Sequence, residues 1–171
     1  MTISVGDQLP NVILHYVEHD PSASVEACQH SVTLKTHSFL KGKKAIIFSI
    51  SSTFTLTCQE VYIPSYLTRH AELKDQGYDH IICVSITDGY IMNAFGKVVG
   101  VYDKIIMAGD GNGEFYVVLG LTQNLKHVGM GELCAKRFAI VVNNLVVKYV
   151  GVETEPGVGP SGAEAILNAK L

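Results

Sequence analysis

The segment Ala45–Ile50 most strongly limits how this chain can fold. All of its residues except Ser49 are apolar, and such a run is typical of a central strand covered on both faces. The segment His80–Ile86 has the same character and predicts a second buried strand. Two short buried strands separated by a longer, helix-like interval indicate an α/β architecture.

The interval between these strands has the spacing of an amphipathic helix. Apolar residues recur at every fourth position, at Ile63, Leu67 and Ala71. Pro64 lies early in this pattern and predicts a kink, because proline cannot donate a backbone hydrogen bond. Gly77 is suited to end the helix. We therefore expect one kinked helix here.

The rest of the chain continues the alternation and then adds a hairpin. The predicted elements are a helix capped by Asp88 and running through Val99, a short strand at 104–107, hairpin strands at 137–142 and 145–150 joined by Asn143-Asn144, and a closing helix at 162–169. This order is typical of a thioredoxin-like fold, in which helices cover both faces of a central mixed β-sheet. We expect residues 1–171 to form a single domain of this α/β class.

Composition excludes several classes of function. A net charge of −3 leaves no basic footprint for nucleic acid. No stretch approaches the ~18 consecutive apolar residues that a membrane span requires. The segment Met1–Asp7 lacks the layout of a secretory signal, so four cysteines predict an intracellular protein with reduced thiols.

The sequence offers no convincing metal site or cofactor site. Cys28, His30 and His37 form a loose group that lacks a fourth ligand, and no Cys-x-x-Cys pair occurs. The segment Asp110–Glu114 begins like a calcium loop, but the glycine and glutamate that such a loop needs further on are missing. It is interpreted as a turn that leads into a helix. We expect neither a metal nor a cofactor.

Cys58 is the strongest candidate for a reactive side chain. It lies where the first predicted strand gives way to a helix, and the unpaired N–H groups at a helix start favour the thiolate form. The thiolate is the form of cysteine that attacks electrophiles. The hydroxyls of Thr53, Thr55 and Thr57 are close enough in sequence to donate hydrogen bonds there. The alternative is that Cys58 is a small apolar residue of the core.

The residues around Cys58 resemble the active-site segment of a known family. Thr55-x-x-Cys58, with Phe54 before it and Ile63–Tyr66 after it, resembles the peroxidatic segment of the peroxiredoxins. The resemblance is greatest to the atypical two-cysteine branch, which includes plant type II and fungal peroxisomal alkyl hydroperoxide reductases. It extends over nearly the whole chain, through the segments Val5–Pro10, Ile82–Asp88 and Lys136–Val142.

This resemblance implies a thiol-dependent peroxidase that reduces hydrogen peroxide and alkyl hydroperoxides. Cys58 would attack the peroxide as the peroxidatic cysteine and become sulfenic acid. Thr55 would orient the peroxide through its hydroxyl, and Arg137 would hold the thiolate and the peroxide oxygens. The alternative for Arg137 is a surface salt-bridge residue, which its place at the start of an apolar strand disfavours.

The active-site loop departs from the family at one position. Peroxiredoxins have a proline where this chain has Ser51, three residues before the Phe54-Thr55 pair. We expect a looser loop, and a serine hydroxyl that hydrogen-bonds the thiolate and blunts its attack. Ser51 therefore keeps open an alternative function, a low-activity or non-catalytic module for redox sensing or chaperone-like binding.

Turnover also requires a second thiol to resolve the sulfenic acid. Cys28 resembles the resolving cysteine of fungal members, which bridges subunits, and Cys83 matches the second cysteine of plant type II members but lies in a buried strand. Cys134 has no counterpart, and Ser161 stands near the resolving position of animal members. The order of expectation is Cys28, then Cys83, then direct reduction by an external thiol.

The resemblance further implies partners and a compartment. The electrons would come from thioredoxin, or from glutaredoxin with glutathione, and the protein would be a homodimer. The C-terminal Ala169-Lys170-Leu171 differs from the Ser-Lys-Leu peroxisomal signal by one small residue. It also suits the last turn of a helix. We expect the cytoplasm or the peroxisomal matrix.

Overall fold

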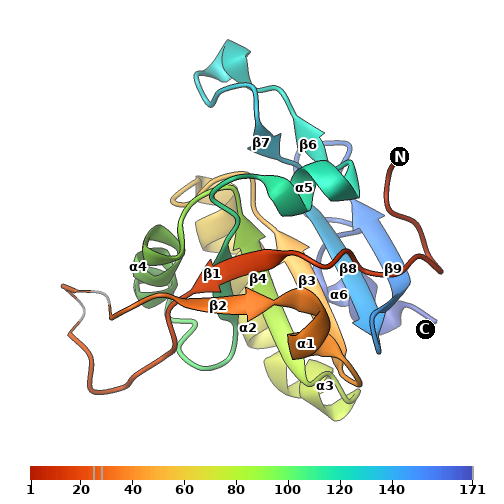
Figure 1. The fold of residues 1–171 in the computed structure, drawn as a ribbon, viewed down its shortest axis with the longest axis horizontal. Coiled ribbons are helices and arrows are strands. Elements are labelled where there is room, and N and C mark those ends of the chain that lie inside the picture. Colours follow the sequence, from red (N-terminus) through yellow and green to blue (C-terminus); the bar gives the residue numbers. More distant parts are fainter. Residues whose placement is uncertain (25, 28, 171) are drawn as a thin grey trace.

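The computed structural model describes residues 1–24, 26–27 and 29–170. Cys28, the first candidate for the resolving thiol, lies outside the described residues. Most of the described strands form one seven-stranded sheet in the order β2-β1-β5-β4-β3-β8-β9 (Figure 1). The strands of this sheet are β1 (Ile13–Tyr16), β2 (Val32–Lys35), β3 (Lys44–Ser49), β4 (His80–Ser85), β5 (Ile106–Gly109), β8 (Phe138–Asn143) and β9 (Val146–Val152).

The sheet is mixed. β3 pairs with β4, and β4 with β5, in parallel, whereas β3–β8, β8–β9, β1–β5 and β1–β2 are antiparallel. A separate two-stranded ribbon of β6 (Thr122–Gln123) and β7 (Cys134–Ala135) projects beyond α5 at the top of Figure 1. β3 and β4 are buried along almost their whole length, as continuous apolar runs require.

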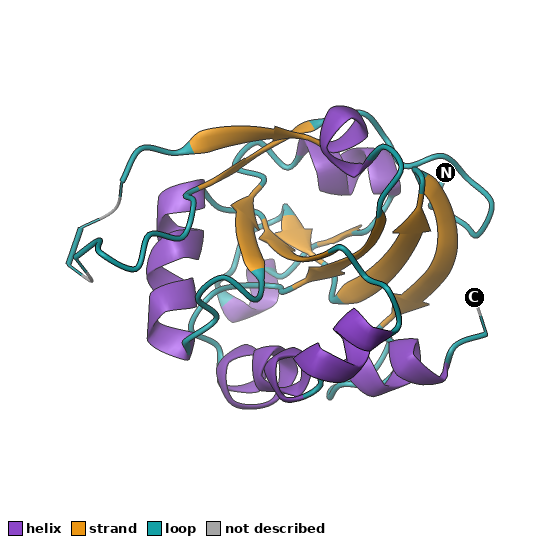
Figure 2. Cartoon of the chain, turned by 90° about the horizontal axis from the view of Figure 1, so that it is seen from below, coloured by secondary structure: helices purple, strands orange, loops and turns teal. Residues whose placement is uncertain are grey.

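Helices cover both faces of this sheet (Figure 2). They are α1 (Thr36–Leu40), the π-helical turn η1 (Cys58–Tyr62), α2 (Ile63–Thr68), α3 (His70–Asp75), α4 (Gly89–Val99), α5 (Glu114–Leu119) and α6 (Ala163–Asn168). The 3₁₀ turn η2 (Lys126–Val128) lies instead between β6 and β7, in the projecting ribbon. Ile46 and Phe48 of β3 face the core that includes η1, α2, α4 and α6, and Ala45 and Ile47 face the core that includes α1 and α5. The predicted thioredoxin-like fold, with helices on both faces of a mixed sheet, is confirmed.

The helix predicted between β3 and β4 is instead broken into three pieces. The irregularity expected at Pro64 is present as a change of helix type: the N–H of Ile63 donates to the carbonyl oxygen of Cys58, five residues back, and Pro64 follows at the start of α2. The π-helical turn η1 precedes it. The second break falls at Arg69, whose φ of −94° and ψ of 8° separate α2 from α3. Gly77, with a φ of 84°, follows α3 as predicted.

Two other predicted boundaries are shifted. The strand predicted at 104–107 is found at Ile106–Gly109, because the small residues after the apolar run pair with the end of β4. A Cβ at Gly109 would lie 2.4 Å from the carbonyl oxygen of Thr87, so only glycine fits there. The hairpin turns at Asn144 and Leu145, which have positive φ, because Asn143 is still paired in the sheet.

Within the residues that the structure describes, no helix combines the length and the apolar character needed to cross a membrane. In the same residues, no group of three or more His, Cys, Asp or Glu side chains is arranged to hold a metal ion.

Candidate active site

Cys58 is buried at the end of the connection that leaves β3. The chain turns through residues 50–55 and becomes helical at Leu56, and Cys58 is the first residue of η1. Its side chain is only 1% exposed and belongs to the same core cluster as Phe48, Tyr62 and Cys83. Burial alone fits both interpretations of Cys58, a reactive thiol and a core residue, so its surroundings must distinguish them.

The loop before Cys58 has an unusual backbone at Phe54. Phe54 adopts a φ of 57°, a conformation that non-glycine residues seldom take. Its side chain is 54% exposed, and its ring lies 4.8 Å from the ring of Phe95 in α4. The Thr55 hydroxyl donates a 3.4 Å hydrogen bond to the carbonyl oxygen of Ser52, and its carbonyl accepts from the backbone N–H of Gln59. The loop is therefore tied to the first turn that contains Cys58.

Ser51 lies at the start of this loop and is partly buried. The residue before it, Ile50, is still tied to the sheet, because its N–H donates to the carbonyl oxygen of Val84. The loop thus leaves the sheet at Ser51, the position at which the sequence departs from the peroxiredoxin pattern.

Arg137 lies next to the same end of the sheet. β8 begins at Phe138 and runs antiparallel to β3, with Phe48 opposite Ala139. The strand that leads to Cys58 therefore ends beside the point where the strand after Arg137 begins. Arg137 itself is partly buried, so its side chain has access to both protein and solvent.

The backbone on both sides of Arg137 is held by hydrogen bonds from other elements. The carbonyl oxygen of Lys136 accepts from the Ser49 hydroxyl at 2.7 Å, and that of Arg137 accepts from the N–H of Glu153 at 2.9 Å. The carbonyl oxygen of Phe138 accepts from the Tyr62 hydroxyl at 3.1 Å. Because Tyr62 belongs to η1, it fixes the Cys58 turn to the strand that follows Arg137.

The aromatic residues around this turn pack closely. The rings of Phe48 and Tyr66 stack at 3.9 Å, and those of Phe48 and Tyr62 meet edge to face at 5.3 Å. Burial raises the pKa of Tyr62 well above its ordinary value, so its hydroxyl remains a hydrogen-bond donor. η1 is therefore anchored by both packing and a hydrogen bond.

Cys83 lies in the central strand β4, directly opposite Phe48 of β3. Its side chain has no exposed surface. Burial raises the pKa of the Cys83 thiol well above its ordinary value, and its electrostatic interaction with the neighbouring Cys58 acts in the same direction. Cys83 is thus protonated and enclosed in the folded protein, as its buried position in the sequence indicated.

The remaining two positions are engaged in structural contacts. The Cys134 thiol in β7 lies 2.9 Å from the carbonyl oxygen of Met130. Ser161 is buried, and both its hydroxyl and its N–H donate to Glu153, at 2.5 and 2.9 Å. Glu153 therefore joins the loop before α6 to the backbone of Arg137.

Sequence reasoning identified Cys58, Thr55, Phe54, Ser51, Cys83 and Arg137 but missed four residues that hold them. These are Ser49, Tyr62 and Glu153, which contact the Cys58 turn or the backbone beside Arg137, and Tyr116, whose hydroxyl is hydrogen-bonded to Ser49. The one signal in the sequence was Ser49, the single polar residue within an apolar run.

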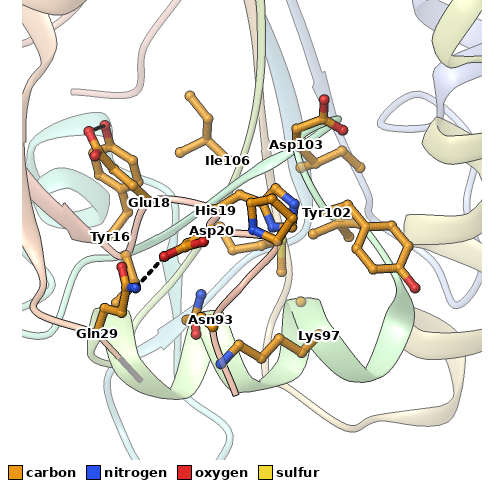
Figure 3. Close-up of a pocket in the computed structure, with 17 residues that line it drawn as sticks. Tyr16, Glu18, His19, Asp20, Gln29, Asn93, Lys97, Tyr102, Asp103 and Ile106 are labelled. Atoms are coloured by element: carbon orange, nitrogen blue, oxygen red, sulfur yellow. Dashed lines mark hydrogen bonds between the residues drawn. The ribbon is translucent and has the colours of Figure 1, made fainter. Parts of the chain in front are cut away.

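A cavity of about 470 Å³ lies elsewhere, between the segment after β1, α4 and the segment 101–107 (Figure 3). Its floor is apolar and includes Val101 and Met107, and Lys97 of α4 donates to the carbonyl oxygens of Ser24 and Ala27 above it. Cys58 is not among its lining residues. The cavity is therefore separate from the candidate active site.

Comparison with known proteins agrees with this arrangement. A family model described as Redoxin matches residues 4–167. Peroxiredoxin-2C of Arabidopsis thaliana is 34% identical over 167 residues, covering 98% of each chain, and the chloroplastic peroxiredoxin-2E of the same plant is 36% identical, covering 98% of this chain and 69% of its own.

The similarity extends to solved structures. Reduced Prx3 of Vibrio vulnificus in complex with hydrogen peroxide is 31% identical, covers 97% of this chain and 98% of its own, and superposes with a TM-score of 0.84. These relatives do not favour the alternative of a non-catalytic binding module. The chain belongs to the Redoxin family and is a peroxiredoxin of the type II branch, a thiol-dependent peroxidase that acts on a peroxide with electrons from a thiol reductant.

Proposed function

We propose that Cys58 is the peroxidatic cysteine of this enzyme. Its thiolate attacks the terminal oxygen of a hydroperoxide, the O–O bond breaks, and the sulfur keeps the oxygen as sulfenic acid. The other oxygen leaves with the bonding electrons and is protonated to water or an alcohol. This assignment is supported most directly by the pairing of β3 with β8, which sets the segment leading to Cys58 beside the start of the strand after Arg137.

Arg137 and Thr55 complete the proposed site. Breaking the O–O bond develops negative charge on the leaving oxygen, so donors already aimed at that atom lower the barrier. The guanidinium of Arg137 offers several donors in a fixed planar fork and stays charged at every physiological pH. The Thr55 hydroxyl would exchange its long 3.4 Å bond to Ser52 for a bond to the peroxide.

The proposed role of the loop is to hold the peroxide over Cys58. Phe54 would shield the thiolate, with its strained backbone held by ring packing on Phe95. Ser51 in place of the family's proline would leave the loop more mobile and supply a hydroxyl that competes for the thiolate. We therefore propose a slower attack than a proline at this position would allow.

Resolution of the sulfenic acid is proposed to use Cys28 first. Attack by that thiol on the Cys58 sulfur would release water and leave a disulfide. Cys83 is the second candidate, but it is enclosed in β4, so bridging it to Cys58 would require η1 to unwind. Direct reduction by an external thiol is third. The proposed electron donor is thioredoxin, or glutaredoxin with glutathione.

We further propose that the chain is a single domain that forms a homodimer. Apolar side chains that a partner would cover are exposed near the site, at Phe54 and Leu56 before Cys58 and at Ile91 in the first turn of α4. The proposed compartment is the peroxisomal matrix or the cytoplasm. A relative from Lipomyces kononenkoae, 36% identical over 166 residues, carries the words "peroxisomal peroxiredoxin" in its name.

The experiment that tests these assignments together is mass spectrometry after one equivalent of hydrogen peroxide. We expect the added oxygen on Cys58, or a disulfide between Cys58 and a second cysteine, identified in the peptide map. Oxidation that leaves Cys58 unmodified would show that another thiol reacts first. A disulfide that joins two chains would support Cys28 and the dimer, and one within a chain would support Cys83.

A further inference from the structure

A buried serine connects two distant parts of the fold beside the active site. Ser49, the last residue of β3, is fully buried and makes two short hydrogen bonds. Its Oγ lies 2.7 Å from the carbonyl oxygen of Lys136 and 2.8 Å from the hydroxyl oxygen of Tyr116. Both partners come from outside β3, Tyr116 from α5 and Lys136 from the segment before β8.

The direction of these two bonds follows from the number of protons. A carbonyl oxygen only accepts, so the single hydroxyl proton of Ser49 is donated to Lys136. The other bond then needs its proton from Tyr116. Burial raises the pKa of Tyr116 well above its ordinary value, so that proton is retained. The result is a relay in which Tyr116 donates to Ser49 and Ser49 donates to Lys136.

The carbonyl group of Lys136, which accepts the last hydrogen bond of this relay, belongs to the peptide bond between Lys136 and Arg137. The C=O of Lys136 and the N–H of Arg137 lie in one rigid plane. The next plane is held through the Arg137 carbonyl, which accepts from the N–H of Glu153 at 2.9 Å. Fixing the planes on both sides of a residue fixes its φ and ψ, and hence the direction of its Cα–Cβ bond.

The relay is itself rigid. The ring of Tyr116 has no exposed surface and meets the ring of Phe138 edge to face at 5.7 Å. The N–H of Tyr116 donates to the buried carboxylate of Asp110 at 3.3 Å. The Tyr116 hydroxyl therefore has a fixed place from which to hold Ser49.

We propose that Ser49 and Tyr116 are positioning residues that direct the Arg137 side chain toward the peroxide bound over Cys58. This inference rests on the proposed role of Arg137. It extends the site to Tyr116 of α5, which lies 21 positions before Arg137 in the sequence. Tyr116 acts on the arginine only through Ser49.

The test is a cycle of substitutions at Tyr116 and Arg137. Tyr116→Phe keeps the ring and removes only the donor, so Ser49 still satisfies Lys136. The quantity measured is the rate constant for Cys58 oxidation by hydrogen peroxide, obtained by competition with a haem peroxidase. We expect Tyr116→Phe to lower it about 10-fold in the native background, because small misplacements of a catalytic group are costly. We expect a change of less than about twofold in the Arg137→Ala background.

Two further variants make the outcome specific. Ser49→Ala breaks the relay at its centre and should show the same dependence on Arg137. Tyr78→Phe is the control, because Tyr78 is a buried tyrosine that comes just before β4, at the opposite end of the parallel strands β3 and β4 from the Cys58 turn. We expect it to change the rate by less than about twofold.

The possible results separate the inference from the proposal beneath it. If Tyr116→Phe and Ser49→Ala leave the native rate unchanged, or slow oxidation equally with and without Arg137, the relay does not position Arg137 and the inference is wrong. If Arg137→Ala alone leaves the rate unchanged, the proposed role of Arg137 is wrong, and the inference falls with it.

Discussion

The hydroxyl of Tyr62, four residues after Cys58, donates a 3.1 Å hydrogen bond to the carbonyl oxygen of Phe138, the residue after Arg137. One side chain thus joins the turn that carries the proposed nucleophile to the strand that carries its proposed partner. Both groups of this bond are buried, so removing the Tyr62 hydroxyl takes a buried hydrogen bond away from the carbonyl of Phe138.

Tyr62→Phe should therefore weaken both the fold and the site. We expect a loss of about 1 kcal/mol in the free energy of unfolding, measured by urea denaturation, because one buried neutral hydrogen bond is removed. We also expect slower oxidation of Cys58, because η1 is freed from β8. Unchanged stability together with an unchanged oxidation rate would mean that packing alone holds this turn.

Arg137→Ala should slow the reaction of Cys58 with hydrogen peroxide by about 100-fold, since donors aimed at developing charge have effects of this size. Arg137→Lys should recover only part of the rate, because lysine keeps the charge but not the planar fork. Arg69→Ala is the matched control, since Arg69 pairs with Glu72 at the surface between α2 and α3. Equal rates for the Arg137 and Arg69 variants would exclude a role for Arg137 in the reaction.

Ser51→Pro should accelerate the oxidation of Cys58 by about 3- to 10-fold, because the proline ring stiffens the loop and the substitution removes the competing hydroxyl. Ser51→Ala separates the two effects, since it removes the hydroxyl and leaves the backbone free. The measurement is the same peroxide competition, together with titration of the Cys58 thiol. If Ser51→Pro instead slows the oxidation of Cys58, this loop needs the serine for its reaction, and the expectation is wrong.

Alkaline pH should destabilise the protein through Cys83. Burial raises the pKa of Cys83 in the folded state above its ordinary value of 9.0. The unfolded chain therefore releases the Cys83 proton at a lower pH than the folded chain does, and the free energy of unfolding falls as pH rises above about 9. In the Cys83→Ala variant, the free energy of unfolding should no longer fall between pH 9 and 10. Above the ordinary tyrosine pKa of 10.0, the buried tyrosines also lower the free energy of unfolding. An identical slope in Cys83→Ala would assign the effect to other groups.

The sequence was most informative where local pattern and tertiary position coincide. β3 and β4 were predicted to within a residue because continuous apolar runs are needed wherever a strand is covered on both faces. The Asp88 cap of α4 was predicted because its carboxylate only has to reach the N–H of Ile91, three residues later. β1 and β2 were not predicted, because each strand has only four residues and is largely exposed on one side.

The supports of the site could not be predicted for a different reason. The bond from Tyr62 spans 76 positions of the sequence, and the two bonds of Ser49 span 67 and 87. Such long-range hydrogen bonds depend on which strands lie next to each other in the sheet. The spacing of residues along the sequence does not reveal this. Cys58 was identified by its place between a predicted strand and a predicted helix, and Arg137 by the resemblance of its segment to that of the peroxiredoxins.

The oxidation state of Cys58 after reaction with one equivalent of hydrogen peroxide tests the central claim most directly. Peroxide should be consumed with Cys58 found as sulfenic acid or as a disulfide, and Cys58→Ser should consume none. Cys134→Ser is the control, because Cys134 is also buried but is held in β7 against Met130, and this variant should react like the native protein. Full peroxide consumption by Cys58→Ser would contradict the account.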